Sequence, residues 1–166
     1  MIKTCLSKNK ARVLEKDKFK QFFEKGFGQE KARSIYIDLN ETAYLLEKKK
    51  IELYDHDSKI NFDTLSRRKD FDVNEYLVYK DLRSRGYNIG SGLKYGFNFR
   101  LYDKGINGKE DHSLWLVEVF DEADRVNIRT FTAKNRVAHS SRKKMLFAIV
   151  DREGSITYIE NSWRRL

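Results

Sequence analysis

Side chains suited to proton transfer flank a glycine-containing loop in the second half of the sequence. Tyr102 and His112 stand at the two ends of this loop, which contains Gly105 and Gly108. Strands on either side of such a loop can pair as a hairpin, which would bring the two side chains together. A phenol and an imidazole are both groups that can exchange a proton. The same pattern also fits a packing tyrosine and a surface histidine, so the spacing alone leaves both interpretations open.

A cationic stripe follows further along the chain. Arg136, His139 and Lys143 recur at helical spacing within a segment predicted to be a helix over 130–144. On spacing alone, the stripe is best interpreted as a solvated helix face, which basic stripes usually are.

Metal-binding side chains are too few and too scattered to predict a metal site. The sequence has three histidines and a single cysteine, Cys5, and it lacks a second cluster of carboxylates at ligand spacing. A metal-dependent DNA nuclease would need carboxylates around a divalent ion. Glu118 is a possible ligand, but the usual acidic pair before such a strand is missing and the sequence has no proline. We therefore expect no metal and no cofactor.

The charge balance favours a polyanionic partner. Lys and Arg outnumber Asp and Glu by 34 to 25, which gives a formal charge of +9, so nucleic acid is the leading partner class. A lysine-rich proteome would produce the same balance without any binding. The sequence contains neither an apolar run long enough to span a bilayer nor the apolar region of a signal peptide, so no membrane association and a cytoplasmic location are expected.

The first part of the chain is predicted to be a small mixed α/β domain. Asp38 followed by Glu41 is the pattern of a capping box and begins a helix over 39–48. The charged run 67–70 is interpreted as a linker, which gives domains over 1–70 and 71–166. The other elements predicted here are strands at 12–15, 34–37 and 51–54 and helices at 18–25 and 62–67.

The second part has a more regular pattern of hydrophobic residues. Asp72 and Glu75 form another capping box ahead of a helix over 76–83. Alternation over 97–102 places Tyr102 on the polar face of a strand. Strand, helix and strand in succession predict a parallel crossover and hence a mixed central sheet flanked by helices, in an α/β (α+β) fold. The remaining predicted strands are 114–120, 145–150 and 155–161.

Three blocks of this second part carry a resemblance to a known family. They are YLVYKDLRSRGYNIGSGLKYGFNFRLY from Tyr76, DHSLWLVEVF from Asp111 and RVAHSSRKKMLFAIVD from Arg136. In order and separation they resemble the archaeal tRNA-splicing endonucleases, and the sequence before Asp72 is compatible with them. The resemblance implies a nuclease-like C-terminal domain, an N-terminal domain with a role in assembly, and an active site made of Tyr102, His112 and Lys143.

The implied reaction is cleavage of precursor tRNA at a bulge-helix-bulge without a metal. A ribose 2′-hydroxyl attacks the adjacent phosphate and leaves a 2′,3′-cyclic phosphate and a 5′-hydroxyl. Tyr102 would act as the base, His112 as the acid and Lys143 as the electrostatic stabiliser. A phenol ordinarily titrates near pH 10, so a base role requires nearby cations that lower the pKa of Tyr102, for which Lys143 and Arg100 are candidates. Otherwise Tyr102 acts mainly by orienting the 2′-hydroxyl.

The resemblance also implies residues for RNA binding and for assembly. Arg136 matches one arginine that clamps a bulged base, and either Arg164 or Arg165 matches the second. An acidic turn would dock onto a neighbouring subunit; its residues are Asp121, Glu122 and Asp124. A homotetramer is expected, with a heterotetramer as the alternative. The main functional alternative is a non-catalytic subunit of the same complex.

Overall fold

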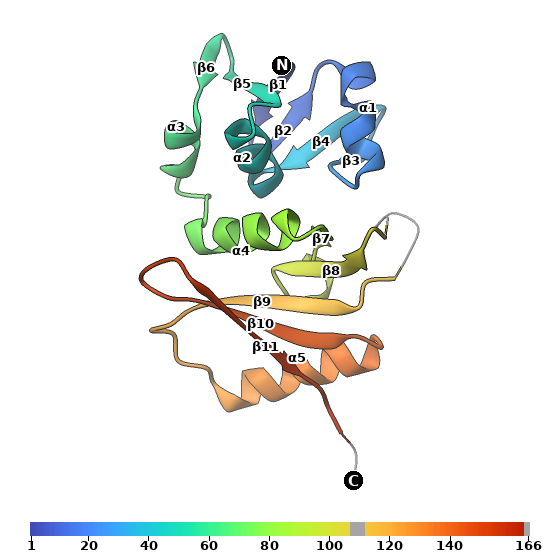
Figure 1. Ribbon diagram of the computed structural model, residues 1–166, viewed down its shortest axis with the longest axis vertical. Helices are drawn as coiled ribbons and strands as arrows, with labels where there is room; N and C mark the ends of the chain where they lie inside the picture. Colours follow the sequence, from blue (N-terminus) through green and yellow to red (C-terminus); the bar gives the residue numbers. More distant parts are fainter. Residues whose placement is uncertain (107–111, 165–166) are drawn as a thin grey trace. The chain divides into compact units, whose positions relative to one another are not determined.

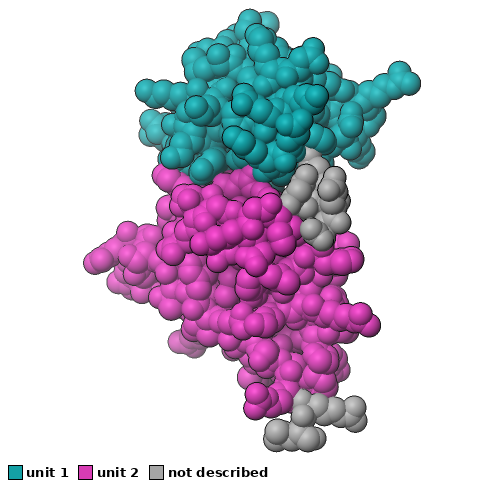
Figure 2. Space-filling model, turned by 45° about the vertical axis from the view of Figure 1, so that its right-hand side comes forward, with its two compact units in different colours: residues 1–76 teal, residues 77–166 magenta. Residues whose placement is uncertain are grey.

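Two compact units make up the structure, a computed structural model that describes residues 1–106 and 112–164. Unit 1 comprises Met1–Tyr76 and unit 2 comprises Leu77–Leu166 (Figure 2). Among the described residues, each unit contains one sheet that mixes parallel and antiparallel pairs. The predicted α/β class with a mixed sheet is therefore confirmed. In the described part of the chain, no helix combines the length and the apolar character needed to cross a membrane.

The sheet of unit 1 has the strand order β3-β4-β2-β1-β5-β6 (Figure 1). Strands β1 and β5 are its parallel pair, and the other neighbours are antiparallel. The strands are β1 (Ile2–Ser7), β2 (Lys10–Val13), β3 (Gln29–Lys31), β4 (Ser34–Asp38), β5 (Ile51–Asp55) and β6 (Ser58–Ile60). The helices are α1 (Lys16–Glu24), α2 (Leu39–Glu47) and α3 (Phe62–Ser66).

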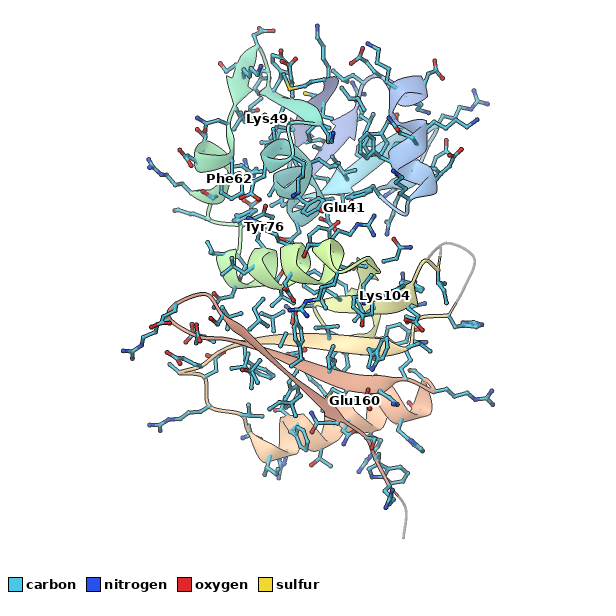
Figure 3. All side chains as sticks on the ribbon, in the orientation of Figure 1. Glu41, Lys49, Phe62, Tyr76, Lys104 and Glu160 are labelled. Atoms are coloured by element: carbon cyan, nitrogen blue, oxygen red, sulfur yellow. The ribbon has the colours of Figure 1, made fainter. Side chains whose placement is uncertain are left out.

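The start of α2 is fixed by the predicted capping box. The side chain of Asp38 accepts a hydrogen bond from the Glu41 amide at 2.8 Å, and the Glu41 carboxylate accepts one from the Asp38 amide at 2.9 Å. The other oxygen of Glu41 accepts from the Gly28 amide at 2.8 Å, so one carboxylate holds two segments of unit 1 together. Glu41, whose side chain is labelled in Figure 3, is only 7% exposed. Without this carboxylate, both backbone amides would lose these acceptors.

We predict that Glu41→Ala destabilises the protein by about 2–4 kcal/mol, because two backbone donors lose their acceptor and the helix loses half of its cap. Urea unfolding followed by circular dichroism measures this change. Glu41→Gln keeps one accepting oxygen and should lose less. An alanine variant as stable as the parent protein would show that the buried carboxylate contributes nothing to folding.

Unit 2 is a sheet covered by one helix on each face (Figure 1). The strand order is β11-β10-β9-β8-β7, and β9 and β10 are its parallel pair. The strands are β7 (Tyr87–Ser91), β8 (Phe99–Lys104), β9 (Trp115–Asp121), β10 (Lys144–Val150) and β11 (Ile156–Asn161). The helices are α4 (Val73–Ser84), the short 3-10 helix η1 (Leu93–Tyr95) and α5 (Ile128–Ser140). The predicted parallel strand-helix-strand unit is confirmed by β9, α5 and β10.

Each long helix is fastened to the sheet by specific contacts. The ring of Tyr79 on α4 packs against Phe99 on β8, and the Tyr158 hydroxyl on β11 donates to Asp81 on α4 at 2.8 Å. Burial, together with this hydrogen bond, raises the pKa of Tyr158 well above its usual range. On the opposite face, Ala138 of α5 packs with Met145 of β10 and other buried residues.

Helix α5 ends earlier than the sequence pattern predicts. Arg142 adopts a left-handed conformation with φ of 55°, its amide donates to the His139 carbonyl, and the Lys143 amide donates to the Ala138 carbonyl. These two bonds form a Schellman motif, which closes a helix. The prediction that Lys143 continues a cationic stripe on the helix is therefore wrong. The residue instead lies between the helix and β10.

Candidate active site

Strand register brings the three predicted catalytic segments to one end of the unit 2 sheet. Trp115 of β9 pairs with Leu101 of β8 on one side and with Lys144 of β10 on the other. Tyr102 comes one position after the β8 member of this row, His112 three positions before the β9 member, and Lys143 one position before the β10 member. Because β8 runs antiparallel to β9 and β10 runs parallel to it, all three residues lie beyond the row toward the same end of the sheet.

Lys143 lies directly beside the backbone that follows His112. Its Nζ donates to the Ser113 carbonyl at 3.1 Å, and the Lys144 amide donates to the Leu114 carbonyl at 2.9 Å. The Lys143 side chain is half-buried, whereas His112 is exposed. These hydrogen bonds join the segment that carries Lys143 to the two residues that follow His112.

Tyr102 is placed differently from the prediction. The sequence pattern puts it on the polar face of its strand, but it is only 2% exposed. It does share a face with Arg100, whose Cζ lies 5.8 Å from the centre of the phenol ring. On the neighbouring strand β7, a Cβ added at Gly90 would lie 3.5 Å from this ring, which is ordinary van der Waals contact. The alternation of polar and apolar residues correctly predicted that Tyr102 shares a face of β8 with Arg100, but it did not predict that the Tyr102 side chain is buried.

Glu118, the acidic residue considered as a metal ligand, is engaged by a lysine. Lys134 of α5 forms an ion pair with Glu118 and also donates to the Gly96 carbonyl at 2.8 Å. The Lys134 ammonium lies 5.1 Å from the centre of the Phe97 ring. These contacts join α5 to β9 and to the loop before β8. Over residues 1–106 and 112–164, no three histidine, cysteine, aspartate or glutamate side chains are grouped so that they could hold a metal ion.

The predicted RNA-binding arginines lie at the outer face of α5 and after β11. Arg136 is exposed on α5, one turn before His139. The His139 ring packs against Trp163, with ring centres 4.4 Å apart. This contact brings the segment that carries the exposed Arg164 to the helix that carries Arg136. Arg165, the other candidate, lies outside the described residues.

The predicted acidic docking turn is exposed and partly paired within the chain. Asp124 accepts a hydrogen bond from the Asp121 amide at 2.9 Å, and Asp121 accepts one from the Ala123 amide at 2.9 Å. Glu122 forms an ion pair of 3.3 Å with Arg152. A surface ion pair of this kind contributes little to stability, so exchanging it for a pair with another chain costs little.

Two residues near these groups were not predicted from the sequence. Tyr95 lies with its ring 5.8 Å from the Lys143 Nζ, and Trp163 packs on His139. Tyr95 stands in a glycine-containing run between Lys94 and Gly96, which marks a loop but gives no sign of its spatial neighbour. Both contacts join residues far apart in the chain, so local spacing could not reveal them.

Together, the fold and the site define an α/β protein with acid–base side chains at one end of a mixed sheet. Comparison with protein-family models gives two matches, which cover most of the chain. Residues 2–66 match the tRNA intron endonuclease N-terminal domain, and residues 73–158 match the tRNA intron endonuclease catalytic C-terminal domain. The chain therefore belongs to the tRNA intron endonuclease family, whose members are endonucleases of tRNA splicing.

Similar proteins among the curated relatives carry the name tRNA-splicing endonuclease. That of Pyrococcus horikoshii is 42% identical over 144 residues, which cover 84% of this chain and 82% of the relative. That of Thermococcus kodakarensis is 44% identical over 142 residues, with 82% of each chain covered. That of Methanococcus maripaludis is 38% identical over 170 residues, which cover 97% of this chain and 93% of the relative. The resemblance found in the sequence blocks is thereby confirmed.

Proposed function

We propose that the chain is the catalytic subunit of a tRNA-splicing endonuclease that cuts precursor tRNA at a bulge-helix-bulge without a metal. The observation that supports this proposal is the hydrogen bond from the Lys143 ammonium to the carbonyl of Ser113, the residue that follows His112 in the chain. The match to the catalytic domain spans 73–158 and includes all three residues of the proposed active site, Tyr102, His112 and Lys143.

The proposed reaction is an internal transesterification of the RNA. The ribose 2′-oxygen forms a bond to phosphorus and loses its proton to a base, while the bond from phosphorus to the 5′-oxygen breaks. The departing 5′-oxygen takes a proton from an acid. The products are a 2′,3′-cyclic phosphate and a 5′-hydroxyl, so atoms and charge balance without a further reactant.

His112 and Lys143 have the exposure and charge that two of these roles require. The exposed imidazole can deliver a proton to the leaving oxygen, because histidine is the side chain that most often serves in general acid–base catalysis. The ammonium of Lys143 can stabilise the negative charge that grows on the phosphorane oxygens. We assign His112 as the acid and Lys143 as the electrostatic stabiliser.

Tyr102 is proposed as the group that receives or orients the 2′-hydroxyl. Because its side chain is buried, this role requires its hydroxyl to become accessible when RNA binds. We predict that Tyr102→Phe lowers the single-turnover cleavage rate about 10- to 100-fold, since it removes one acid–base group and retains the ring. Rapid-quench kinetics with saturating enzyme measure the rate. Cleavage by the phenylalanine variant at the parent rate would reduce Tyr102 to a packing residue.

The decisive test of the function uses the purified chain alone. Bulge-helix-bulge RNA is incubated with the protein in excess EDTA, and the product ends are identified by mass spectrometry. Cleavage at the bulges with 2′,3′-cyclic phosphate ends is expected. Dependence on added Mg²⁺ would contradict the mechanism. Intact RNA that is cut only after a second, related chain is added would instead favour the non-catalytic subunit.

Substrate binding and assembly complete the proposal. Arg136, together with Arg164 or Arg165, would hold a bulged base, because guanidinium groups stack on unpaired bases. The acidic turn of Asp121, Glu122 and Asp124 would dock onto a basic surface of a neighbouring copy. We expect a homotetramer, which light scattering coupled to size exclusion would measure. A monomer or dimer that cuts at full rate would contradict the tetramer.

A further inference from the structure

The two neighbouring lysines at the start of β10 have different electrostatic partners. Lys144 pairs with the carboxylate of Glu160 on β11 at 2.8 Å (Figure 3 labels Glu160). Lys143 contacts only uncharged groups in the described part of the chain, namely the Ser113 carbonyl and the ring face of Tyr95. A carboxylate would largely neutralise an ammonium group, whereas a carbonyl dipole and an aromatic ring hold it in place and leave its full charge.

The Tyr95 ring is itself held in a fixed place. Tyr95 ends η1 and packs against the buried cluster that contains Phe97 and Met145. Its amide donates to the Gly92 carbonyl at 2.9 Å, and the Phe97 amide donates to the same carbonyl at 3.3 Å. A Cβ at Gly92 would lie 2.6 Å from the Phe97 carbonyl oxygen, so only glycine allows this tight turn. The ring is therefore a rigid support rather than a mobile surface group.

From these contacts we propose that Tyr95 is a positioning residue for the cleavage reaction. Its ring face, 5.8 Å from the Lys143 Nζ, and the Ser113 carbonyl hold the ammonium from two elements and aim it at the scissile phosphate. This inference rests on the proposed role of Lys143. It adds a residue from the loop before β8 to a site otherwise built at the strand ends.

The same ring lies 4.9 Å from the Nζ of a second cation, Lys94. An effect of removing the ring could therefore pass through either lysine. A double-mutant cycle between Tyr95 and Lys143 separates the two routes. An effect of the Tyr95 change that passes through Lys143 is lost in the Lys143→Ala background, whereas an effect that passes through Lys94 remains.

The test measures single-turnover cleavage by Tyr95→Leu and Tyr95→Phe, each in the parent chain and in Lys143→Ala. The leucine variant should cleave about 3- to 30-fold more slowly, the range expected from the loss of a cation-π contact. The phenylalanine variant keeps the ring face and should stay within about twofold of the parent rate. In the Lys143→Ala background, neither change should slow cleavage further. Within each background, binding of a 2′-deoxy RNA that cannot react should not change with the residue at position 95.

Matched controls distinguish positioning from folding. Tyr44→Leu removes a ring that lies 5.8 Å from the Nζ of Lys48 in unit 1, and it should leave the cleavage rate unchanged. Thermal unfolding would show whether the leucine variant folds. If it does not, Tyr95→Met replaces it, because a flexible apolar side chain can fill the same space. An equal loss of rate with and without Lys143, or no loss in the parent chain, would overturn the proposal for Tyr95. A Lys143→Ala variant as fast as the parent would instead overturn the proposed function.

Discussion

Replacing Lys143 with alanine is expected to slow the single-turnover cleavage of bulge-helix-bulge RNA by about 100- to 1,000-fold, the effect of removing one preorganised group that stabilises transition-state charge. Among the described residues, the ammonium contacts the Ser113 carbonyl and the Tyr95 ring rather than a carboxylate, and we propose that its charge acts on the phosphorane. Binding of a non-reactive 2′-deoxy RNA should change much less, because the charge matters most as the phosphorane forms.

The adjacent lysine supplies the control. Lys144 carries the same charge one residue further along, but its ammonium pairs with Glu160. Lys144→Ala should therefore cleave close to the parent rate while losing the same formal charge. Equal losses in the two variants would show that general attraction of RNA explains the effect. Parent-like cleavage by Lys143→Ala would exclude Lys143 from the chemistry.

Replacing His112 with alanine is expected to lower the cleavage rate by about 100- to 10,000-fold, the range for loss of a general acid. The role can be isolated with an RNA in which sulfur replaces the 5′-oxygen at the scissile bond. A thiolate leaves without a proton, so His112→Ala should cut this substrate nearly as fast as the parent protein does. Rapid-quench kinetics with both RNAs provide the measurement.

A second histidine shows whether the effect is specific. His56 is exposed in the turn between β5 and β6 of unit 1, and His56→Asn should leave both rates unchanged. If sulfur substitution failed to rescue His112→Ala while the variant remained folded, the imidazole would not be the proton donor. It would then act on the 2′-hydroxyl or on RNA placement.

Local patterns in the sequence predicted those parts of the fold that short-range interactions determine. The capping box of Asp38 and Glu41 begins α2 as expected, because both partners lie within one helical turn. The Asp72 side chain likewise accepts a hydrogen bond from the Glu75 amide at 3.0 Å before α4. The hairpin of β8 and β9 and the parallel pair β9 and β10 followed from the order of the elements.

Other features depend on contacts that spacing does not encode. The end of α5 was missed because Arg142, not glycine, takes the left-handed position, so the usual stop signal is absent. The burial of Tyr102 depends on what covers its face of the sheet. Strand β3 was missed because all three of its residues, Gln29–Lys31, are polar and exposed, which leaves no alternation to detect. The catalytic roles of Tyr102, His112 and Lys143 stay predictions that the kinetic experiments address.

The hydrogen bonds that join the Lys143 segment to the backbone after His112 affect how the enzyme would select its RNA. The Lys144 amide already donates to the Leu114 carbonyl in the free chain, and Lys143 already reaches Ser113. Little conformational entropy then remains to be lost by these two backbone segments when RNA binds. The remaining adjustment would fall on the buried Tyr102 and on the RNA, so an RNA whose phosphate does not fit against these segments would be released before it reacts.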